Sequence, residues 1–200
     1  MMKIKTILLS SLAATMLFAC GTEGEDQATT KGSDDDVKKE IKEDQKEVKK
    51  EENKLMVVMD AKSGSSAEGH INLEQKDNKV MMEVKVKGLA PGEHAIHIHE
   101  NGDCSADDGT SAGGHWDPTG HDHGKWGEDA YHMGDIGNLI ANDKGEVSFK
   151  FVTEKWCIGS EDKTMNIIGK SFIIHAGADD FKSQPSGAAG SRVACGVIEK

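Results

Sequence analysis

The sequence predicts an all-β fold, an antiparallel sandwich or barrel, for residues 55–200. Short apolar segments separated by turn residues recur along this region, and none of its segments carries a helical stripe of ten or more residues. Glycine accounts for 23 of the 200 residues and aromatic side chains for only 4%, which favours turns and loops over a helical bundle. Many short strands with frequent turns are typical of sandwiches and barrels.

The expected strands are runs in which apolar residues cluster or alternate with polar ones. They cover residues 55–59, 70–74, 80–86, 95–99, 146–152, 171–175 and 193–198. The second and third runs alternate with a period of two, so that one face of each strand is apolar. Lys76, Asp77 and Asn78 lie between these two runs and form the expected turn.

The stretch from Gly102 to Gly134 interrupts this pattern, because it contains no strand-like apolar run. A loop of that length inside a compact domain needs something to hold it. It carries one cysteine and four histidines, namely Cys104, His115, His121, His123 and His132. Metal ligation and disulfide bonding are therefore the expected ways of ordering it.

The N-terminal residues have the features of a secretory signal. A positively charged start precedes an apolar run at residues 7–18, which is too short to span a bilayer as a helix. The run ends in Leu17-Phe18-Ala19-Cys20, which resembles a bacterial lipobox. The resemblance implies a lipoprotein signal peptide at 1–19, cleaved before Cys20, and acylation of the Cys20 thiol. The alternative is an ordinary cleaved signal in which Cys20 has no special role.

Residues 20–54 are acidic and then rich in lysine and glutamate, with almost no apolar side chains. Such a segment cannot bury enough surface to offset its conformational entropy. We therefore expect a lipidated, charged, flexible tether between Cys20 and a folded domain at 55–200. Attachment to a membrane through Cys20 would locate the protein in the bacterial cell envelope, on the periplasmic or the outer face.

The formal net charge of −11 excludes a general attraction for nucleic acid. If the substrate is an anion, a local positive group has to overcome the field of the whole protein.

Histidines are concentrated in the second half of the chain, where eight of the nine lie at or after His94. His97 and His99 are two residues apart on one expected strand, so their side chains share a face and can converge on one ion. His175 ends another apolar strand, and Asp135 closely follows the loop histidines. Neutral imidazoles suit copper and zinc, and a set with one carboxylate still suits zinc.

Five segments, in order, resemble the copper–zinc superoxide dismutase family, in its bacterial type. They are residues 92–103, which contain His97-Ile98-His99, and residues 111–118, 132–138, 169–175 and 187–198. The resemblance extends from about residue 55 to the end of the chain. It implies a Greek-key β-sandwich or flattened barrel of about eight strands, with a long metal-binding loop and an electrostatic loop. It also implies disproportionation of superoxide to oxygen and hydrogen peroxide.

Carried over residue by residue, the resemblance implies two metal sites. Copper would be bound by His97, His99, His115 and His175, and zinc by His115, His123, His132 and Asp135. His115 would bridge the two metals and take part in proton transfer. His121 competes with His123 for the zinc role, and His123 fits better because it lies eight residues after His115 and nine before His132. His70 and His94 are not ligands in this scheme.

The resemblance assigns three further roles. Asp179 would accept hydrogen bonds from His97 and His123, the alternative being a loop carboxylate or turn cap. Arg192 would be the positive group that attracts the superoxide anion, the alternative being a surface charge. Cys104 and Cys195 would form a disulfide. Cys157 has no counterpart and is left as a small buried side chain or an intermolecular disulfide partner.

Two other classes of protein compete with the enzyme. One is a non-catalytic copper- and zinc-binding surface lipoprotein, and the other is a structural lipoprotein with a degenerate site. The presence of every matched ligand and of Arg192 favours the enzyme. The sequence leaves open whether the protein is a monomer or a homodimer.

Overall fold

The structure is a computed structural model, and it describes residues 53–200. The predicted signal peptide, Cys20 and all but the last two residues of the tether lie outside the described residues. The first strand begins at Asn53, two residues before the expected domain start, because the backbones of Asn53 and Lys54 pair with Gln75 and Glu74. The prediction relied on apolar side chains, whereas the polar end of this strand depends on backbone pairing.

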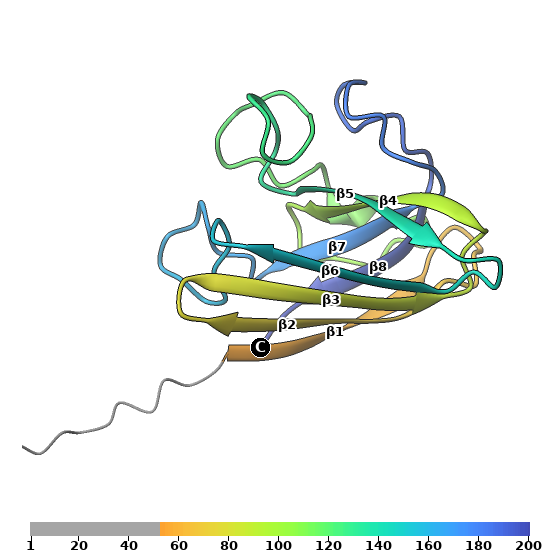
Figure 1. Cartoon of the computed structure of the whole chain (residues 1–200), viewed down its shortest axis with the longest axis horizontal. Coiled ribbons are helices and arrows are strands. Elements are labelled where there is room, and N and C mark those ends of the chain that lie inside the picture. Colours follow the sequence, from red (N-terminus) through yellow and green to blue (C-terminus); the bar gives the residue numbers. More distant parts are fainter. Residues whose placement is uncertain (1–52) are drawn as a thin grey trace, which may run out of the picture. The chain divides into compact units, whose positions relative to one another are not determined.

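Eight antiparallel strands form one sheet that curls into a flattened barrel (Figure 1). They are β1 (Asn53–Ala61), β2 (Glu68–Lys76), β3 (Lys79–Lys87), β4 (Gly92–His99), β5 (Asp135–Ala141), β6 (Val147–Thr153), β7 (Lys170–His175) and β8 (Arg192–Ile198). Their order in the sheet is β5-β4-β7-β8-β1-β2-β3-β6. β1 pairs with β2 along most of its length but with β8 only at Asp60 and Ala61, where the two halves of the sheet meet. The predicted all-β class is confirmed.

The alternation of β3 shows how the sequence builds the core. Val80, Met82, Val84 and Val86 are buried, while the residues between them face outward or are only partly covered. Each apolar side chain removed from water in this way contributes roughly 1.5–3 kcal/mol. The inward residues of the other strands complete the main apolar core between the two halves of the sheet, and Ala112, Ile173 and Cys195 form a second, smaller cluster.

β5 is a strand that the sequence analysis did not predict. Its burial comes mainly from Ile136 and Leu139, with Gly137 and Asn138 between them, so no continuous apolar run marks it. Its register with β4 shifts between Ile96 and His97. Such bulges redirect side chains, and this one lies beside a candidate ligand.

The loop between β4 and β5 contains no strand and only a short 3₁₀ helix, Thr110–Ala112. Figure 1 shows it on the same side of the barrel as the β7–β8 loop, residues 176–191. The disulfide between Cys104 and Cys195, 91 residues apart, joins the β4–β5 loop to β8. Residues 53–200 contain no helix long and apolar enough to cross a bilayer.

Candidate metal centre

Four histidines from three parts of the chain meet on the face of β4 and β7 that points away from the main core, into which Ile96, Ile98 and Ile174 of these strands point. β4 supplies His97 and His99, β7 ends in His175, and the loop contributes His115. Adjacent β4 and β7 bring the first three together, and a single antiparallel bridge between His99 and His115 holds the loop against β4. One imidazole nitrogen of each residue lies within 4.8 Å of the others.

In each of these four rings, one nitrogen has an oxygen partner and the other has none within residues 53–200. The partnered nitrogens are His97 Nε2 with Asp179 (2.9 Å), His99 Nδ1 with the Gly113 carbonyl (2.9 Å), His115 Nδ1 with Asp135 (2.8 Å) and His175 Nδ1 with the Gly190 carbonyl (3.1 Å). The unpartnered ones are His97 Nδ1, His99 Nε2, His115 Nε2 and His175 Nε2. Buried polar atoms without partners are costly, and here four of them converge. A cation is the natural partner for such a group of lone pairs.

The protonation states of these rings suit metal binding. Burial lowers the pKa of His99 to about 2 and that of His175 to about 3. Burial also lowers the pKa of His115 to about 4, although its hydrogen bond to Asp135 opposes the shift. These imidazoles are therefore neutral near pH 7, which is the form that ligates copper or zinc.

A second group surrounds the carboxylate of Asp135, the first residue of β5. The Nδ1 atoms of His115, His123 and His132 lie 2.8, 3.0 and 3.3 Å from its oxygens. Burial alone would raise the pKa of Asp135, but the hydrogen bond with His115 and the close ring nitrogens of His123 and His132 hold it well below its usual range. Three imidazoles with one carboxylate suit zinc, and His115 belongs to both groups.

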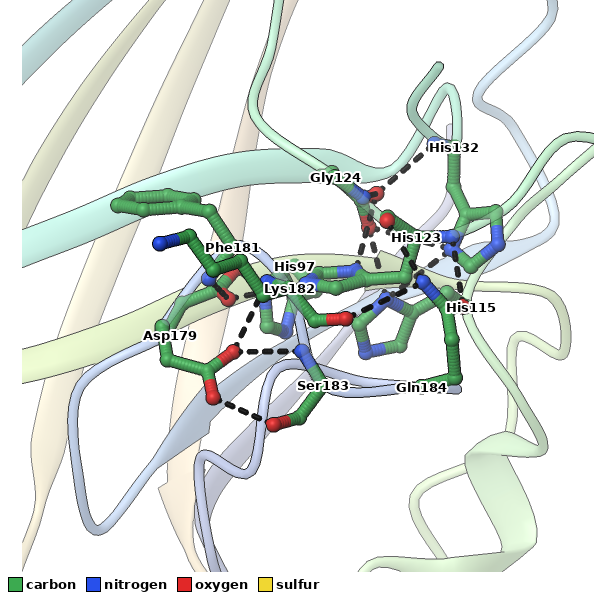
Figure 2. A network of polar contacts seen from close by, with 12 residues as sticks. His97, His115, His123, Gly124, His132, Asp179, Phe181, Lys182, Ser183 and Gln184 are labelled. Carbon is green, nitrogen blue, oxygen red and sulfur yellow. Dashed lines mark hydrogen bonds and ion pairs between the residues drawn. The ribbon is translucent and has the colours of Figure 1, made fainter.

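Asp179 connects the two groups (Figure 2). Its Oδ2 lies 2.9 Å from Nε2 of His97, and its Oδ1 lies 2.9 Å from Nε2 of His123. The side chain of Asn138 on β5 binds both the backbone N–H and the carbonyl of Asp179. A buried carboxylate held in this way determines which nitrogen of each ring carries the proton.

Arg192, the first residue of β8, lies close enough to the group of four histidines for its charge to act on His99 and His175. Its NH1 and NH2 atoms donate hydrogen bonds to the carbonyls of Gly109 and Gly113, each at 2.7 Å. The Gly113 carbonyl also contacts His99 Nδ1, so one backbone oxygen connects the guanidinium to a ring of the group. Burial is the main cause of the lowered pKa of His175. The neighbouring His97 and His115 lower it further, and so does the positive charge of Arg192.

The other histidines of residues 53–200 and the free cysteine belong to neither ligand group. His121 is exposed, and His70 is half-buried on β2. His94 is buried, and its two ring nitrogens each lie 2.8 Å from a carbonyl oxygen, one of His175 and the other of Ala90. Cys157 is a free, half-buried thiol.

Sequence reasoning missed an aromatic cluster and one polar side chain near the second group. Trp126, in the loop between His123 and His132, packs on Phe151 at 5.1 Å and on Trp156 at 5.6 Å between ring centroids. The indole N–H of Trp156 donates to the carbonyl of Met133, next to His132. Gln184 binds the backbone of His123. No periodicity marks these contacts, because they join separate loops and strands.

Comparison with known proteins gives consistent matches. Residues 67–198 match the family model described as copper/zinc superoxide dismutase (SODC). The chain is 40% identical over 135 residues to "Superoxide dismutase [Cu-Zn] 2" of Aquifex aeolicus, a match covering 65% of this chain and 78% of that protein. It is 38% identical over 147 residues to "Superoxide dismutase [Cu-Zn]" of Caulobacter vibrioides, covering 71% of this chain and 83% of that protein.

Proposed function

Because the chain belongs to the copper/zinc superoxide dismutase family, we propose that it disproportionates superoxide to oxygen and hydrogen peroxide. The copper ligands are His97, His99, His115 and His175. The zinc ligands are His115, His123, His132 and Asp135. Both sets come from the two groups that the fold brings together.

One observation carries the proposal: four buried imidazole nitrogens converge without a protein partner, and the opposite nitrogen of each ring is held by an oxygen. A site that only stabilised the fold would be expected to pair these atoms with one another or with backbone groups. The arrangement therefore fits a bound cation with nitrogen preference, and the neighbouring carboxylate-containing group fits zinc.

When bound, copper would supply the one-electron chemistry by which one superoxide is oxidised to oxygen and a second, with two protons, is reduced to hydrogen peroxide. Around it, Arg192 presents a permanent positive charge to the anion. His115 directs Nε2 into the copper group and Nδ1 toward Asp135, so it can hold a proton at Nε2 beside the reacting oxygens. Asp179 keeps the proton of His97 on Nε2, which leaves Nδ1 free to ligate.

The test is metal analysis of the purified full chain together with a superoxide dismutation assay. The enzyme is expected to bind copper and zinc in equal amounts and to lose activity when copper is removed. A protein that binds both metals but does not dismutate superoxide would instead be the non-catalytic metal-binding lipoprotein.

The proposal includes a location, which rests on residues outside the described part of the chain. The lipobox-like Leu17-Phe18-Ala19-Cys20 and the charged tether support anchoring through an acylated Cys20 in the bacterial cell envelope. Acyl chains on Cys20 should hold the protein in the membrane fraction, and Cys20→Ala should release it without changing the fold. Wild-type protein found entirely in the soluble fraction would refute the anchor.

A further inference from the structure

The side chain of Gln184, in the β7–β8 loop, pairs with both backbone polar groups of His123 (Figure 2). The His123 N–H donates to Gln184 Oε1 at 2.9 Å, and Gln184 Nε2 donates to the His123 carbonyl at 2.9 Å. The amide therefore takes the place that a neighbouring strand would occupy in a sheet.

His123 needs these two bonds because of where it lies. It is only 3% exposed, yet it belongs to no strand or helix that would satisfy its backbone. Unpaired backbone groups in such a position are costly. Among the hydrogen bonds found in residues 53–200, those to Gln184 are the ones that its N–H and carbonyl make.

A short turn holds Gln184 in position. The backbone N–H groups of Lys182 and Ser183 donate to Asp180 Oδ1 at 2.9 and 2.8 Å, and the N–H of Gly187 donates to the Ser183 carbonyl at 2.6 Å. Gly187 closes the turn against the site, since a Cβ there would overlap Asp179 Oδ1 and lie 2.7 Å from His123 Nε2. The turn thus contacts both the backbone and the ring of His123.

We propose that Gln184 is a positioning residue for the zinc ligand His123. The inference rests on the proposed zinc site. Asp179 holds Nε2 of the ring and Gln184 holds the backbone that carries it, so that Nδ1 stays 3.0 Å from the Asp135 carboxylate, the other group with which it would bind zinc. Gln184 ligates nothing itself, and it makes zinc affinity depend on the conformation of the β7–β8 loop.

The test uses the full chain with two variants, Gln184→Ala and Gln184→Met, of which the second keeps side-chain length and removes both hydrogen bonds. Gln184 is exposed, so neither change opens a cavity in the core. Zinc affinity, measured by competition with a chelator, should fall about tenfold in both, while copper affinity stays at the wild-type value. The absorption bands of cobalt placed in the zinc site should shift, and the His123 amide of metal-free protein should exchange its hydrogen faster.

Gln75→Ala is the matched control, because Gln75 also binds a backbone group, accepting from the N–H of Ile158 at 2.7 Å, but belongs to neither ligand group. It should leave zinc affinity and the cobalt bands unchanged. Unchanged zinc affinity in both Gln184 variants, even with faster exchange at His123, would overturn the inference. So would equal losses of zinc and copper accompanied by a lower melting temperature, which would indicate a general structural role. If His132→Ala left wild-type zinc binding intact, the proposed zinc site itself would fail instead.

Discussion

His115 Nδ1 lies 2.8 Å from Asp135 Oδ1, while the Nε2 atom of the same ring has no partner within residues 53–200. One imidazole thus directs a nitrogen into each ligand group. In His115→Ala, copper should persist on His97, His99 and His175, which are anchored on β4 and β7. Zinc affinity should fall by about 10–100-fold, since its remaining ligands lose their connection to the copper group. The cupric spectrum should change, and activity per bound copper should drop.

His121→Ala is the control for this change, because His121 is exposed and outside both groups. It should leave metal content, spectrum and activity as in the wild type. A copper-loaded His115→Ala protein that kept both its spectrum and its activity would disprove the bridging role.

Asp179→Asn should weaken zinc more than copper. The substitution preserves shape but removes the charge that holds Nε2 of both His97 and His123. His97 remains anchored in β4, whereas His123 lies in a loop and depends on its side-chain contacts. Stepwise addition of a chelator, with both metals followed by atomic absorption, should remove zinc first and at lower chelator concentration than in the wild type. Equal loss of the two metals would contradict this assignment.

Zinc uptake by the metal-free protein should release protons in a pH-dependent way. Burial would lower the pKa of His123, but the adjacent carboxylates of Asp135 and Asp179 outweigh it and raise the pKa to about 9. The protonated ring therefore stabilises the metal-free fold fully below about pH 6.5, the unfolded value, and this contribution is lost as the pH rises through about 9. Zinc must displace that proton, so its affinity should increase between these two pH values.

Calorimetry in buffers of different ionisation enthalpy measures this proton release directly. At pH 7.5 the wild type should release about one proton from His123 on binding zinc, and Asp179→Asn should release less because one of the carboxylates that raise the pKa is gone. Denaturant unfolding of the metal-free wild type should show stability decreasing from pH 6.5 to 9. If the wild type and Asp179→Asn released the same number of protons on binding zinc, His123 would not be the source of those protons.

The sequence was sufficient to predict the strands whose residues alternate or cluster, as β3 does with its four buried apolar residues. It was insufficient for β5, whose pairing depends on β4 and includes a bulge beside His97 rather than an apolar run. The i, i+2 spacing of His97 and His99 follows directly from strand geometry. Bringing His115 and His175 to the same point requires the β4–β7 pairing and the folded loop, which spacing alone does not specify.

Contacts made by side chains to distant backbone were the least predictable. Gln184 to His123 and Trp156 to Met133 both join segments without any local pattern. Glutamine is common in loops and tryptophan in cores, so nothing in the sequence distinguishes Gln184 and Trp156 from other residues of the same types. The resemblance to a family predicted which residues are ligands, but only the structure shows which nitrogen of each ring already has a partner.

Trp126→Ala should weaken zinc binding although Trp126 touches no ligand atom. Its ring attaches the His123–His132 segment to the barrel through Phe151 and Trp156. Because Trp126 is half-buried, the loss in stability should be about 1–3 kcal/mol, below that for a fully buried tryptophan. Trp126→Phe keeps an aromatic ring and should retain most zinc affinity. Denaturant unfolding measures the loss of stability, and chelator competition measures the loss of zinc affinity. A Trp126→Ala protein with wild-type zinc affinity would show that the aromatic cluster does not support the zinc site.

Arg192→Ala should lower activity severalfold or more while both metals remain bound, because Arg192 contributes charge near the copper group but belongs to neither ligand set. Arg192→Lys should retain part of the activity. The charge survives, but a lysine lacks the two-pronged geometry that binds the Gly109 and Gly113 carbonyls together. Since attraction of an anion is screened by salt, wild-type activity should fall as ionic strength rises, and the decline should be shallower in Arg192→Ala. Dismutation rates measured across a salt series for the three proteins, with metal content checked in each, test this directly. An Arg192→Ala protein with wild-type turnover and the same salt dependence would show that the guanidinium only holds the two loop carbonyls in place.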